Sequence, residues 1–382
     1  MRLTFPHMGT LFIPLKALFT GLGCDVVVPP PTSKRTLEIG VKHCPEFACL
    51  PLKISVGNLS EALDLGADTV IMAGGVGPCR FGFYAELQKE ILLDMGYDFR
   101  MVVIDPPQGR ARHILESFKS LFPAVTLSQA LHAARLAWSK IVAIDRLESL
   151  ANRSRALERE RGAVSAALGR ALEAVDAAET VEGVWQACED GLAAIDSLVD
   201  ADKAEYAAGS LVRVAVVGEI YVVLEPFANH CVERKLGELG VIVERPLSIS
   251  HWLKLNVLLD FLNMSGGFRP GELARPYLGH TVGGHGRETV ASAVKYGRQG
   301  YDGVIQVAPF TCMPEIVAES VLHRVSKDHG IASMSLVVDE QTGEAGVVTR
   351  LEAFVDMIRR RRLGHGAVSQ RLTAKNAMCY YD

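Results

Sequence analysis

The feature of this sequence that most limits its possible folds is an alternation of short apolar runs with helix-forming segments. Near the N-terminus, residues 24–29, 69–74 and 100–106 are rich in Val, Ile or Met, and each run ends at a glycine or proline. Such runs, bounded by loop formers, predict buried strands. Strands that alternate with helices predict a parallel sheet, because a parallel connection needs a long crossover that is usually helical.

The same alternation returns after a helical stretch. Residues 212–219, 303–309 and 332–339 predict three further buried strands. Between about 128 and 208 the sequence contains no proline and is rich in Ala, Leu, Glu and Arg, which is typical of helices. We therefore predict an α/β protein with two parallel-sheet domains of the Rossmann or flavodoxin-like kind, at 1–127 and 209–382, and a helical module at 128–208 between them.

Composition narrows the choice of partners and compartment. The 382 residues, 49% of them hydrophobic, are enough for more than one core. A formal net charge of -4 predicts neither a nucleic-acid nor a membrane-surface partner. The N-terminal residues lack the apolar region of a secretory signal, and no run approaches the roughly 20 apolar residues of a membrane span. We expect a cytoplasmic protein whose eight cysteines stay reduced.

Four of the cysteines lie in loops marked by glycine or proline, namely Cys44, Cys49, Cys79 and Cys312. In a reducing compartment such thiols more often bind metal or do redox chemistry than form disulfides. Cys79 and Cys312 follow the ends of predicted strands, where ligands collect in parallel sheets. We therefore predict that the two domains close over one iron–sulfur cluster, with these four cysteines as candidate ligands.

The remaining cysteines have weaker claims to a ligand role. Cys24 lies at the edge of a predicted strand and Cys188 lies in a predicted helix, so we expect both to be small buried residues. Cys231 follows a predicted strand and a turn-like segment, which makes it the best additional ligand. For Cys379, an isolated thiol near the C-terminus, neither role is favoured.

Four segments of the sequence carry a family resemblance. They are residues 44–53 (CPEFACLPLK), 74–79 (GGVGPC), 282–286 (VGGHG) and 309–315 (PFTCMPE). Together they resemble the 2-hydroxyacyl-CoA dehydratase superfamily, specifically its activase-related branch, which includes double-cubane cluster proteins. The resemblance spans nearly the whole chain, although the helical module and the C-terminal tail carry little of it.

The resemblance implies an oxygen-sensitive iron–sulfur reductase component that receives low-potential electrons from a separate ATP-hydrolysing activator and reduces a small molecule. The chain contains no Gly-x4-Gly-Lys-Ser/Thr phosphate loop, so we expect it to be the electron acceptor. In the related dehydratases three cysteines hold one 4Fe–4S cubane, which implies Cys79, Cys312 and one of Cys44 and Cys49 here. Because this branch resembles a single-chain protein, we also expect a homodimer.

The number of available cysteines does not decide between a single cubane and a double cubane. A fourth thiolate would complete a four-cysteine cubane and would favour electron relay over substrate binding at iron. A double cubane of the 8Fe–9S kind would need about three thiolates for each cubane. Six ligands are found only by adding Cys231 and one of Cys24, Cys188 or Cys379. The loop position of Cys231 leads us to expect the double cubane.

Three polar residues are candidate catalytic groups. His285 lies among glycines, and His7 follows a proline at the end of the first predicted strand, so either imidazole is a candidate proton donor near the cluster. Glu315 follows Cys312 by three residues and is a candidate acid. The alternative for the histidines is a hydrogen bond to loop backbone, and for Glu315 it is a position in the first turn of a helix.

Three residues are candidates for binding the cofactor. Gly75 and Gly77 lie in the glycine-rich loop before Cys79 and are expected to offer backbone N–H groups to the cluster sulfides. Lys53 is a candidate to balance sulfide charge or to bind an anionic substrate, with solvent exposure as the alternative.

Other functions remain open at this point. The chain is also compatible with a 2-hydroxyacyl-CoA dehydratase-like subunit. A zinc-binding structural or regulatory protein could use the same thiols, although structural zinc prefers paired Cys-x2–4-Cys ligands. A metal-free protein that binds CoA or a nucleotide would keep the fold without the cluster.

Overall fold

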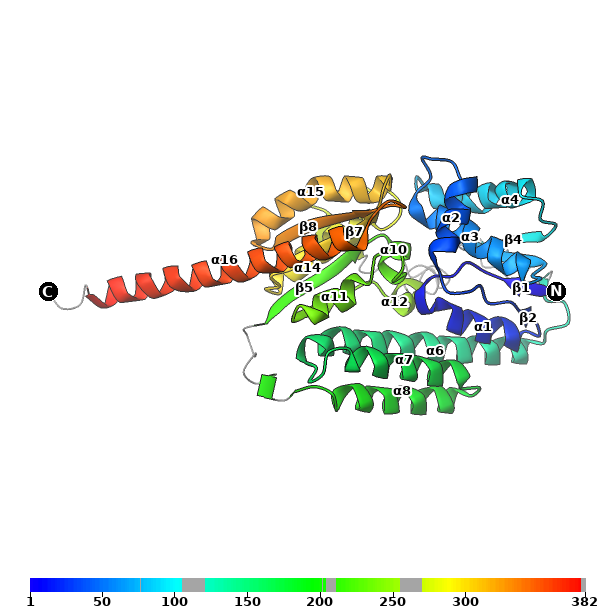
Figure 1. Cartoon of the computed structure of the whole chain (residues 1–382), viewed down its shortest axis with the longest axis horizontal. Helices are drawn as coiled ribbons and strands as arrows, with labels where there is room; N and C mark the ends of the chain where they lie inside the picture. Colours follow the sequence, from blue (N-terminus) through cyan, green and yellow to red (C-terminus); the bar gives the residue numbers. More distant parts are fainter. Residues whose placement is uncertain (76, 105–120, 201, 204–210, 255–269, 379–382) are drawn as a thin grey trace.

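The computed structural model describes residues 1–75, 77–104, 121–200, 202–203, 211–254 and 270–378. Two parallel sheets with their covering helices lie side by side, and a layer of long helices packs beneath them (Figure 1). The α/β class with two parallel-sheet units is therefore confirmed. The helices that separate the sheets in sequence do not form a linker between them in space.

The N-terminal sheet has the strand order β2-β1-β3-β4, and all of its pairs are parallel. Its strands are β1 (Arg2–Thr4), β2 (Asp25–Val26), β3 (Thr69–Ala73) and β4 (Arg100–Ile104). The connecting helices are η1 (Gly9–Leu11), α1 (Phe12–Gly21), α2 (Lys34–His43), α3 (Leu50–Asp64), η2 (Arg80–Phe83) and α4 (Tyr84–Asp94).

The C-terminal sheet repeats this topology, with the order β6-β5-β7-β8 and parallel pairs throughout. Its strands are β5 (Val212–Gly218), β6 (Val241–Glu244), β7 (Gly303–Pro309) and β8 (Ala332–Val338). Its helices are α10 (Ile220–Leu224), α11 (Val232–Glu238), α12 (Ile249–Leu253), η5 (Pro270–Ala274), α14 (Gly286–Arg298), α15 (Met313–His329) and α16 (Glu344–Met378). Helix α16 extends away from the body of the molecule (Figure 1).

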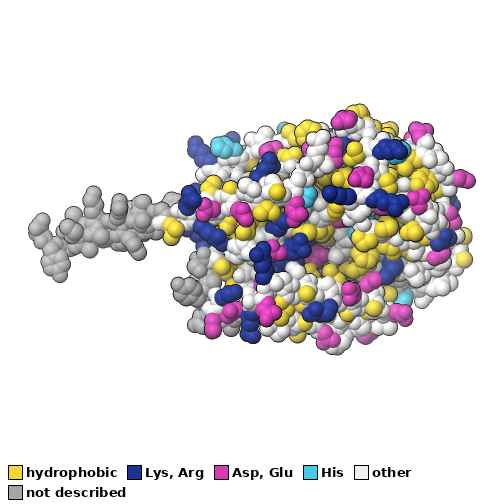
Figure 2. Space-filling model, viewed as in Figure 1, with side chains coloured by type: hydrophobic (Ala, Val, Ile, Leu, Met, Phe, Trp, Pro, Cys, Tyr) yellow, Lys and Arg dark blue, Asp and Glu magenta, His cyan; other side chains and the backbone are white. Residues whose placement is uncertain are grey.

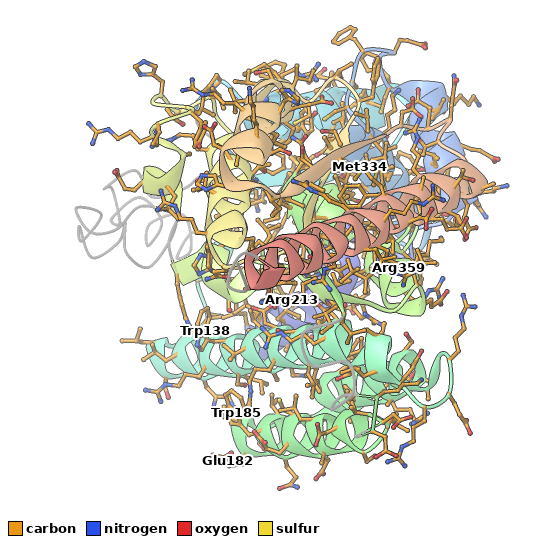
Figure 3. The ribbon with its side chains drawn as sticks, turned by 90° about the vertical axis from the view of Figure 1, so that its left-hand side faces the viewer. Trp138, Glu182, Trp185, Arg213, Met334 and Arg359 are labelled. Carbon is orange, nitrogen blue, oxygen red and sulfur yellow. The ribbon has the colours of Figure 1, made fainter. Side chains whose placement is uncertain are left out.

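The helical layer comprises α6 (Leu127–Ser154), η3 (Arg155–Leu157), α7 (Ala163–Ala177) and α8 (Val181–Asp196). Helix α6 begins with a capping box, in which Thr126 and Gln129 satisfy each other's backbone N–H groups. Small and branched residues fill the core of the layer, among them Ala143, Leu147 and Val164. Figure 3 shows Trp138 and Trp185 in this layer, while Arg213 and Arg359 lie in the C-terminal unit.

Helix α3 belongs to both α/β units. Its residues are apolar or small on nearly every side, and a helix of that kind is buried all round. Leu50 and Ile54 pack into the core of the C-terminal sheet, whereas Leu52 and Val56 pack into the core of the N-terminal sheet. The two sheets therefore share one helix.

The surface offers few cues to a partner. Figure 2 shows positive and negative side chains interspersed on the face that it presents. Within the described residues, no helix is long and apolar enough to cross a bilayer.

Candidate functional site

The carboxyl ends of the central strands of both sheets open into one cleft. Its wall includes Pro6 after β1, Gly74 after β3, Glu219 after β5 and Cys312 after β7. In each sheet the strand order reverses between these two central strands, and such a switch point is where parallel sheets leave a crevice for ligands. The cleft has a volume of about 2640 Å³, and α6 contributes to its wall.

Among the described residues, three cysteines line this cleft: Cys49, Cys79 and Cys312. Each stands directly before a helix, as the N-cap residue of α3, η2 and α15 respectively. Cys49 and Cys312 are buried, and Cys79 is half-buried. The structure thus brings two thiols of the N-terminal unit together with one of the C-terminal unit.

The surroundings of these thiols disfavour their ionised forms when no metal is bound. Burial raises the pKa of Cys49 to about 11 and raises the pKa values of Cys79 and Cys312 as well. The nearby Glu219 carboxylate raises all three pKa values further. Binding a metal here would release protons, because thiolates and not thiols are the ligands.

The helix ends act in the opposite direction. Backbone N–H groups of Leu52, Phe81 and Glu315 lower the pKa values of Cys49, Cys79 and Cys312, although none closes a cap hydrogen bond to the sulfur. The amino-terminal end of a helix carries a partial positive charge that favours an anion. The three thiols therefore lie where backbone dipoles favour thiolates.

Two residues that the sequence analysis did not single out lie beside these thiols. The hydroxyl of Tyr84 hydrogen-bonds to the sulfur of Cys49, and both residues line the cleft. The carboxylate of Glu219 accepts hydrogen bonds from the backbone N–H groups of Tyr221 (3.1 Å) and Val222 (3.0 Å), and burial raises its pKa. Its position at the end of a predicted strand was the available signal for Glu219, whereas nothing in the sequence distinguished Tyr84.

A close backbone approach fixes the position of Glu219. Gly218 has a φ of 137°, and a Cβ atom at this position would lie 1.9 Å from the carbonyl oxygen of Val307. Glycine is the residue that tolerates both conditions. Strands β5 and β7 can therefore pair closely up to the point where the chain turns into the cleft.

His285 lies at the cleft, as the N-cap residue of α14. Its loop packs against the cysteines, since a Cβ atom on Gly284 would lie 3.8 Å from the sulfur of Cys79. Burial lowers the pKa of His285 to about 4, so its imidazole is neutral at pH 7. A role as proton donor stays a prediction, and the neutral ring has one N–H group with which to fill it.

Glu315 lies behind Cys312, in the interior. Its carboxylate accepts hydrogen bonds from Thr289 (3.1 Å) and from the amide of Gln306 (2.7 Å). Burial raises its pKa to about 7. Thr289 lines the cleft, whereas Glu315 is not among the described lining residues. Its catalytic role stays a prediction. The hydrogen bonds from Thr289 and Gln306 are those that any buried carboxyl group needs.

His7 and Lys53 join the two units behind the cleft wall, which includes Pro6 and Met8 on either side of His7. The Nδ1 atom of His7 lies 3.1 Å from a carboxylate oxygen of Glu225, and the same oxygen accepts a hydrogen bond from the N–H of Gly9 (2.8 Å). The buried ammonium of Lys53 lies 2.7 Å from the carboxylate of Glu340. Neither residue is among the described lining residues, and the roles predicted for them stay predictions.

The other two loop cysteines, Cys44 and Cys231, differ in position from the three in the cleft, although Cys44 packs against the core cluster that contains Cys49. Cys44 is the C-cap residue of α2, at the helix end that disfavours an anion, and burial raises its pKa to about 12. Cys231 is the N-cap residue of α11 and has a φ of 56°, with its sulfur 3.8 Å from the carbonyl oxygen of Pro226. Neither is among the described residues that line the cleft.

Of the remaining cysteines and glycines named in the sequence analysis, some line the cleft and others do not. Cys24 and Cys188 are buried in apolar cores, and Cys379 lies outside the described residues. Gly75 lines the cleft and packs against Gly82. Gly77 has a φ of 103° and is not among the described lining residues.

The donor set can be tested against the kinds of metal site considered above. Among the described residues, no three His, Cys, Asp or Glu side chains are gathered closely enough to hold a single metal ion. A cluster has a different requirement, because each thiolate binds a different iron and the sulfurs therefore stay apart. Three separate thiols at helix ends are donors of the kind that an iron–sulfur cluster uses.

Comparison with known proteins adds one finding. A family model described as a CoA enzyme activase uncharacterised domain matches residues 7–72. The match includes Cys44, Cys49 and Lys53 and ends before Cys79. No curated protein matches the chain. The N-terminal part of the chain is thus similar to this domain of unknown function.

Proposed function

We propose that this protein is an iron–sulfur component that holds one 4Fe–4S cluster through Cys49, Cys79 and Cys312 and reduces a small molecule in the cleft. The observation that supports it most is the convergence of three thiols, each at the start of a helix, on the cleft between two strand-order switch points. When bound, the cluster would supply single low-potential electrons.

The choice of Cys49 over Cys44 rests on the ends of two helices. Cys49 begins α3 and lines the cleft, whereas Cys44 ends α2. A thiolate is favoured at the first position and disfavoured at the second. The double-cubane cluster stays a prediction, but it would have to recruit both Cys44 and Cys231, which are not among the described residues of the cleft wall, and a sixth cysteine.

The residues around the thiols have complementary tasks in this proposal. Tyr84 stabilises the Cys49 thiolate through its hydroxyl group. His285, neutral at pH 7, can orient a bound molecule through its ring N–H group. Glu219, whose pKa is raised by burial, is a group that can hold a proton at the cleft wall.

An electron donor is needed, because the sequence contains no phosphate loop for ATP hydrolysis. The relation of residues 7–72 to CoA enzyme activases supports a partner from an ATP-hydrolysing activator system. Thiolate ligands need a reducing compartment, so within this proposal the protein is cytoplasmic.

A dehydratase-like subunit is the second candidate. One observation favours it: three thiolates leave one iron of a 4Fe–4S cluster without a cysteine ligand, and the cleft is open to a bound molecule. Activity towards 2-hydroxyacyl-CoA thioesters, measured with an activator and ATP, separates the two functions. Dehydration would support this candidate, and reduction without dehydration would support the first.

Anaerobic purification with iron and sulfide analysis tests the proposal. We expect a brown protein with about four irons per chain. Cys49→Ser, Cys79→Ser and Cys312→Ser should each lose most of that iron, while Cys44→Ser and Cys231→Ser, the matched controls outside the cleft, should retain it.

Other outcomes have clear meanings. About eight irons in the wild type, with a substantial share lost in Cys231→Ser, would support the double-cubane cluster instead. A colourless protein loaded with zinc would support the structural or regulatory function. Full iron and sulfide in both Cys79→Ser and Cys312→Ser would overturn the ligand assignment.

A further inference from the structure

One exposed side chain connects the three cysteine loops. Arg80 directly follows Cys79, and its guanidinium donates a hydrogen bond through Nη1 to the carbonyl oxygen of Phe47 (3.0 Å), two residues before Cys49. Through Nη2 it donates to the carbonyl oxygen of Thr311 (2.6 Å), the residue before Cys312. Arg80 therefore contacts the chain beside each of the three thiols that line the cleft.

Thr311 completes the connection. Its hydroxyl accepts a hydrogen bond from Nη2 of Arg80 (2.9 Å) and donates one to the carbonyl oxygen of Phe47 (3.2 Å). Thr311 also has a φ of 66°, a left-handed conformation that a β-branched residue rarely adopts. Such a conformation persists where surrounding contacts over-determine it, and these hydrogen bonds are contacts of that kind.

The contacts cross the boundary between the two units. Arg80 and Phe47 belong to the N-terminal unit, and Thr311 belongs to the loop after β7 in the C-terminal unit. The thiols of Cys49 and Cys79 are therefore tied to the thiol of Cys312 by side-chain contacts as well as by the shared helix α3.

An arginine suits this position for a geometric reason. The guanidinium is a rigid plane whose two Nη atoms reach separate acceptors at once, whereas the lysine ammonium is a single point on a flexible stem. Within the described residues Arg80 forms no ion pair, and its acceptors are two carbonyls and one hydroxyl. The contacts of Arg80 are therefore explained by the fork that its two Nη atoms form, and not by neutralisation of a carboxylate.

We propose that Arg80, together with Thr311, is a positioning residue that clasps the three cysteine loops and sets the separation of Cys49, Cys79 and Cys312. The role of this clasp, the set of contacts made by Arg80 and Thr311, rests on the proposed function, because its purpose is to place the ligands of the proposed cluster. Its geometric part, the spacing of the thiols, is a property of the chain without any cofactor, and can be tested separately.

The first measurement uses the cofactor-free chain under reducing conditions. Dibromobimane, a short bifunctional thiol reagent, bridges neighbouring thiols, and peptide mass spectrometry identifies the bridged pairs. Arg80→Lys keeps the charge and removes the fork, and we expect it to reduce the yield of bridges between Cys312 and either N-terminal thiol at least fivefold. Arg80→Gln should do the same.

The second measurement uses the reconstituted protein. With an iron chelator in solution, we expect iron loss from Arg80→Lys to be at least tenfold faster than from the wild type, with a changed electron paramagnetic resonance spectrum. Thr311→Val should act in the same direction, while Thr311→Ser, which keeps the hydroxyl, should stay close to the wild type. This second pair of variants carries the test if Arg80 variants fail to fold.

Arg161→Gln is the matched control. It removes another exposed arginine that joins two parts of the chain, through a hydrogen bond to Glu238 (2.7 Å), away from the cleft. We expect no change in bridging or in iron loss. An equal effect of Arg161→Gln and Arg80→Lys would show a general structural role and overturn the proposal.

The clasp is also overturned if bridging and iron loss in Arg80→Lys, Arg80→Gln and Thr311→Val all stay within twofold of the wild type. A wild type that binds no cluster, but whose bridging falls in these variants, would refute the proposed function and leave the clasp standing. The two failures are therefore distinguishable.

Discussion

The hydroxyl group of Tyr84 hydrogen-bonds to the sulfur atom of Cys49 at the wall of the cleft. Tyr84 begins α4 and Cys49 caps α3, so the bond joins the starts of two helices. The ring of Tyr84 also packs against Phe81, with 5.8 Å between the ring centroids. A hydrogen bond to a ligand sulfur is one of the means by which a protein sets the reduction potential of a cluster.

We therefore expect Tyr84→Phe to lower the reduction potential of the bound cluster. The hydrogen bond favours the more negative, reduced state, and its loss corresponds to roughly 20–60 mV, from about 0.5–1.5 kcal/mol per bond at 59 mV per tenfold change. A redox titration followed by electron paramagnetic resonance measures the shift. The control is Tyr97→Phe, which removes a hydroxyl bonded to Ser60 and Asp64 at the other end of α3. An equal shift in both variants would contradict the assignment.

The buried carboxyl group of Glu315 predicts a pH-dependent stability. Burial raises its pKa from 4.5 to about 7 in the folded chain, so the folded state binds this proton more tightly than the unfolded state. The resulting stabilisation is complete below about pH 4.5 and is lost as the pH rises through 7, with a total of about 3 kcal/mol.

Glu315→Gln should remove this pH dependence. Urea unfolding of the cofactor-free chain between pH 4 and 8 measures it, and we expect the variant to gain stability relative to the wild type as the pH rises. The exposed Glu352 provides the control variant, Glu352→Gln. Parallel stability curves for wild type and Glu315→Gln across this range would show that the carboxyl group does not titrate as stated.

The ion pair of Lys53 and Glu340 predicts a stability effect at the boundary between the units. The Lys53 side chain is 3% exposed, and Glu340→Gln would leave its ammonium without a carboxylate. We expect a loss of about 3–5 kcal/mol in the free energy of unfolding, since breaking a buried pair leaves a charge uncompensated. The double variant Lys53→Met/Glu340→Leu should recover part of it.

The matched control for this pair is the exposed ion pair of Arg360 and Asp356, whose side chains are 79% and 56% exposed. Asp356→Asn should cost no more than about 0.5 kcal/mol. A similar small cost for Glu340→Gln in urea unfolding would mean that Lys53 finds another partner or reaches solvent.

Gly218→Ala should be strongly destabilising. The substitution combines a φ of 137° with a clash at 1.9 Å against the backbone of β7, and we expect a loss of about 3 kcal/mol or more. Gly169→Ala is the control, because Gly169 lies in α7 with no atom within 4 Å of the added Cβ, and alanine there should stabilise by about 0.5–1 kcal/mol. Thermal unfolding of both variants checks the contrast.

The positions of most strands could be predicted from the sequence, because buried parallel strands need continuous apolar runs. The run at 69–74 became β3 (Thr69–Ala73), and 303–309 became β7. The run at 24–29 formed the two-residue strand β2, which lies at the edge of the sheet and is followed by three prolines. Cys79 and Cys312 lie at the cleft because both follow strands that end there.

The rest of the site depends on contacts between distant residues. The sequence left open whether Cys44 or Cys49 lies at the cleft, because the answer depends on where α2 ends and α3 begins. His7 and Lys53 were predicted near the cluster, but their carboxylate partners lie 218 and 287 residues away in sequence. No local pattern reports such pairs. Tyr84 was missed for the same reason, since its importance comes from the contact with Cys49.

The division of the three thiols between the two units has a consequence during synthesis on the ribosome. Cys49 and Cys79 leave the ribosome long before Cys312, and at about 5–20 residues per second the 233 residues that separate Cys79 from Cys312 take roughly 10–50 s to translate. During that interval Leu50 and Ile54 of α3 also lack the sheet they pack against. Insertion of the proposed cluster would therefore follow the completion of the chain, because until then the thiols of Cys49 and Cys79 lack the third thiol, that of Cys312.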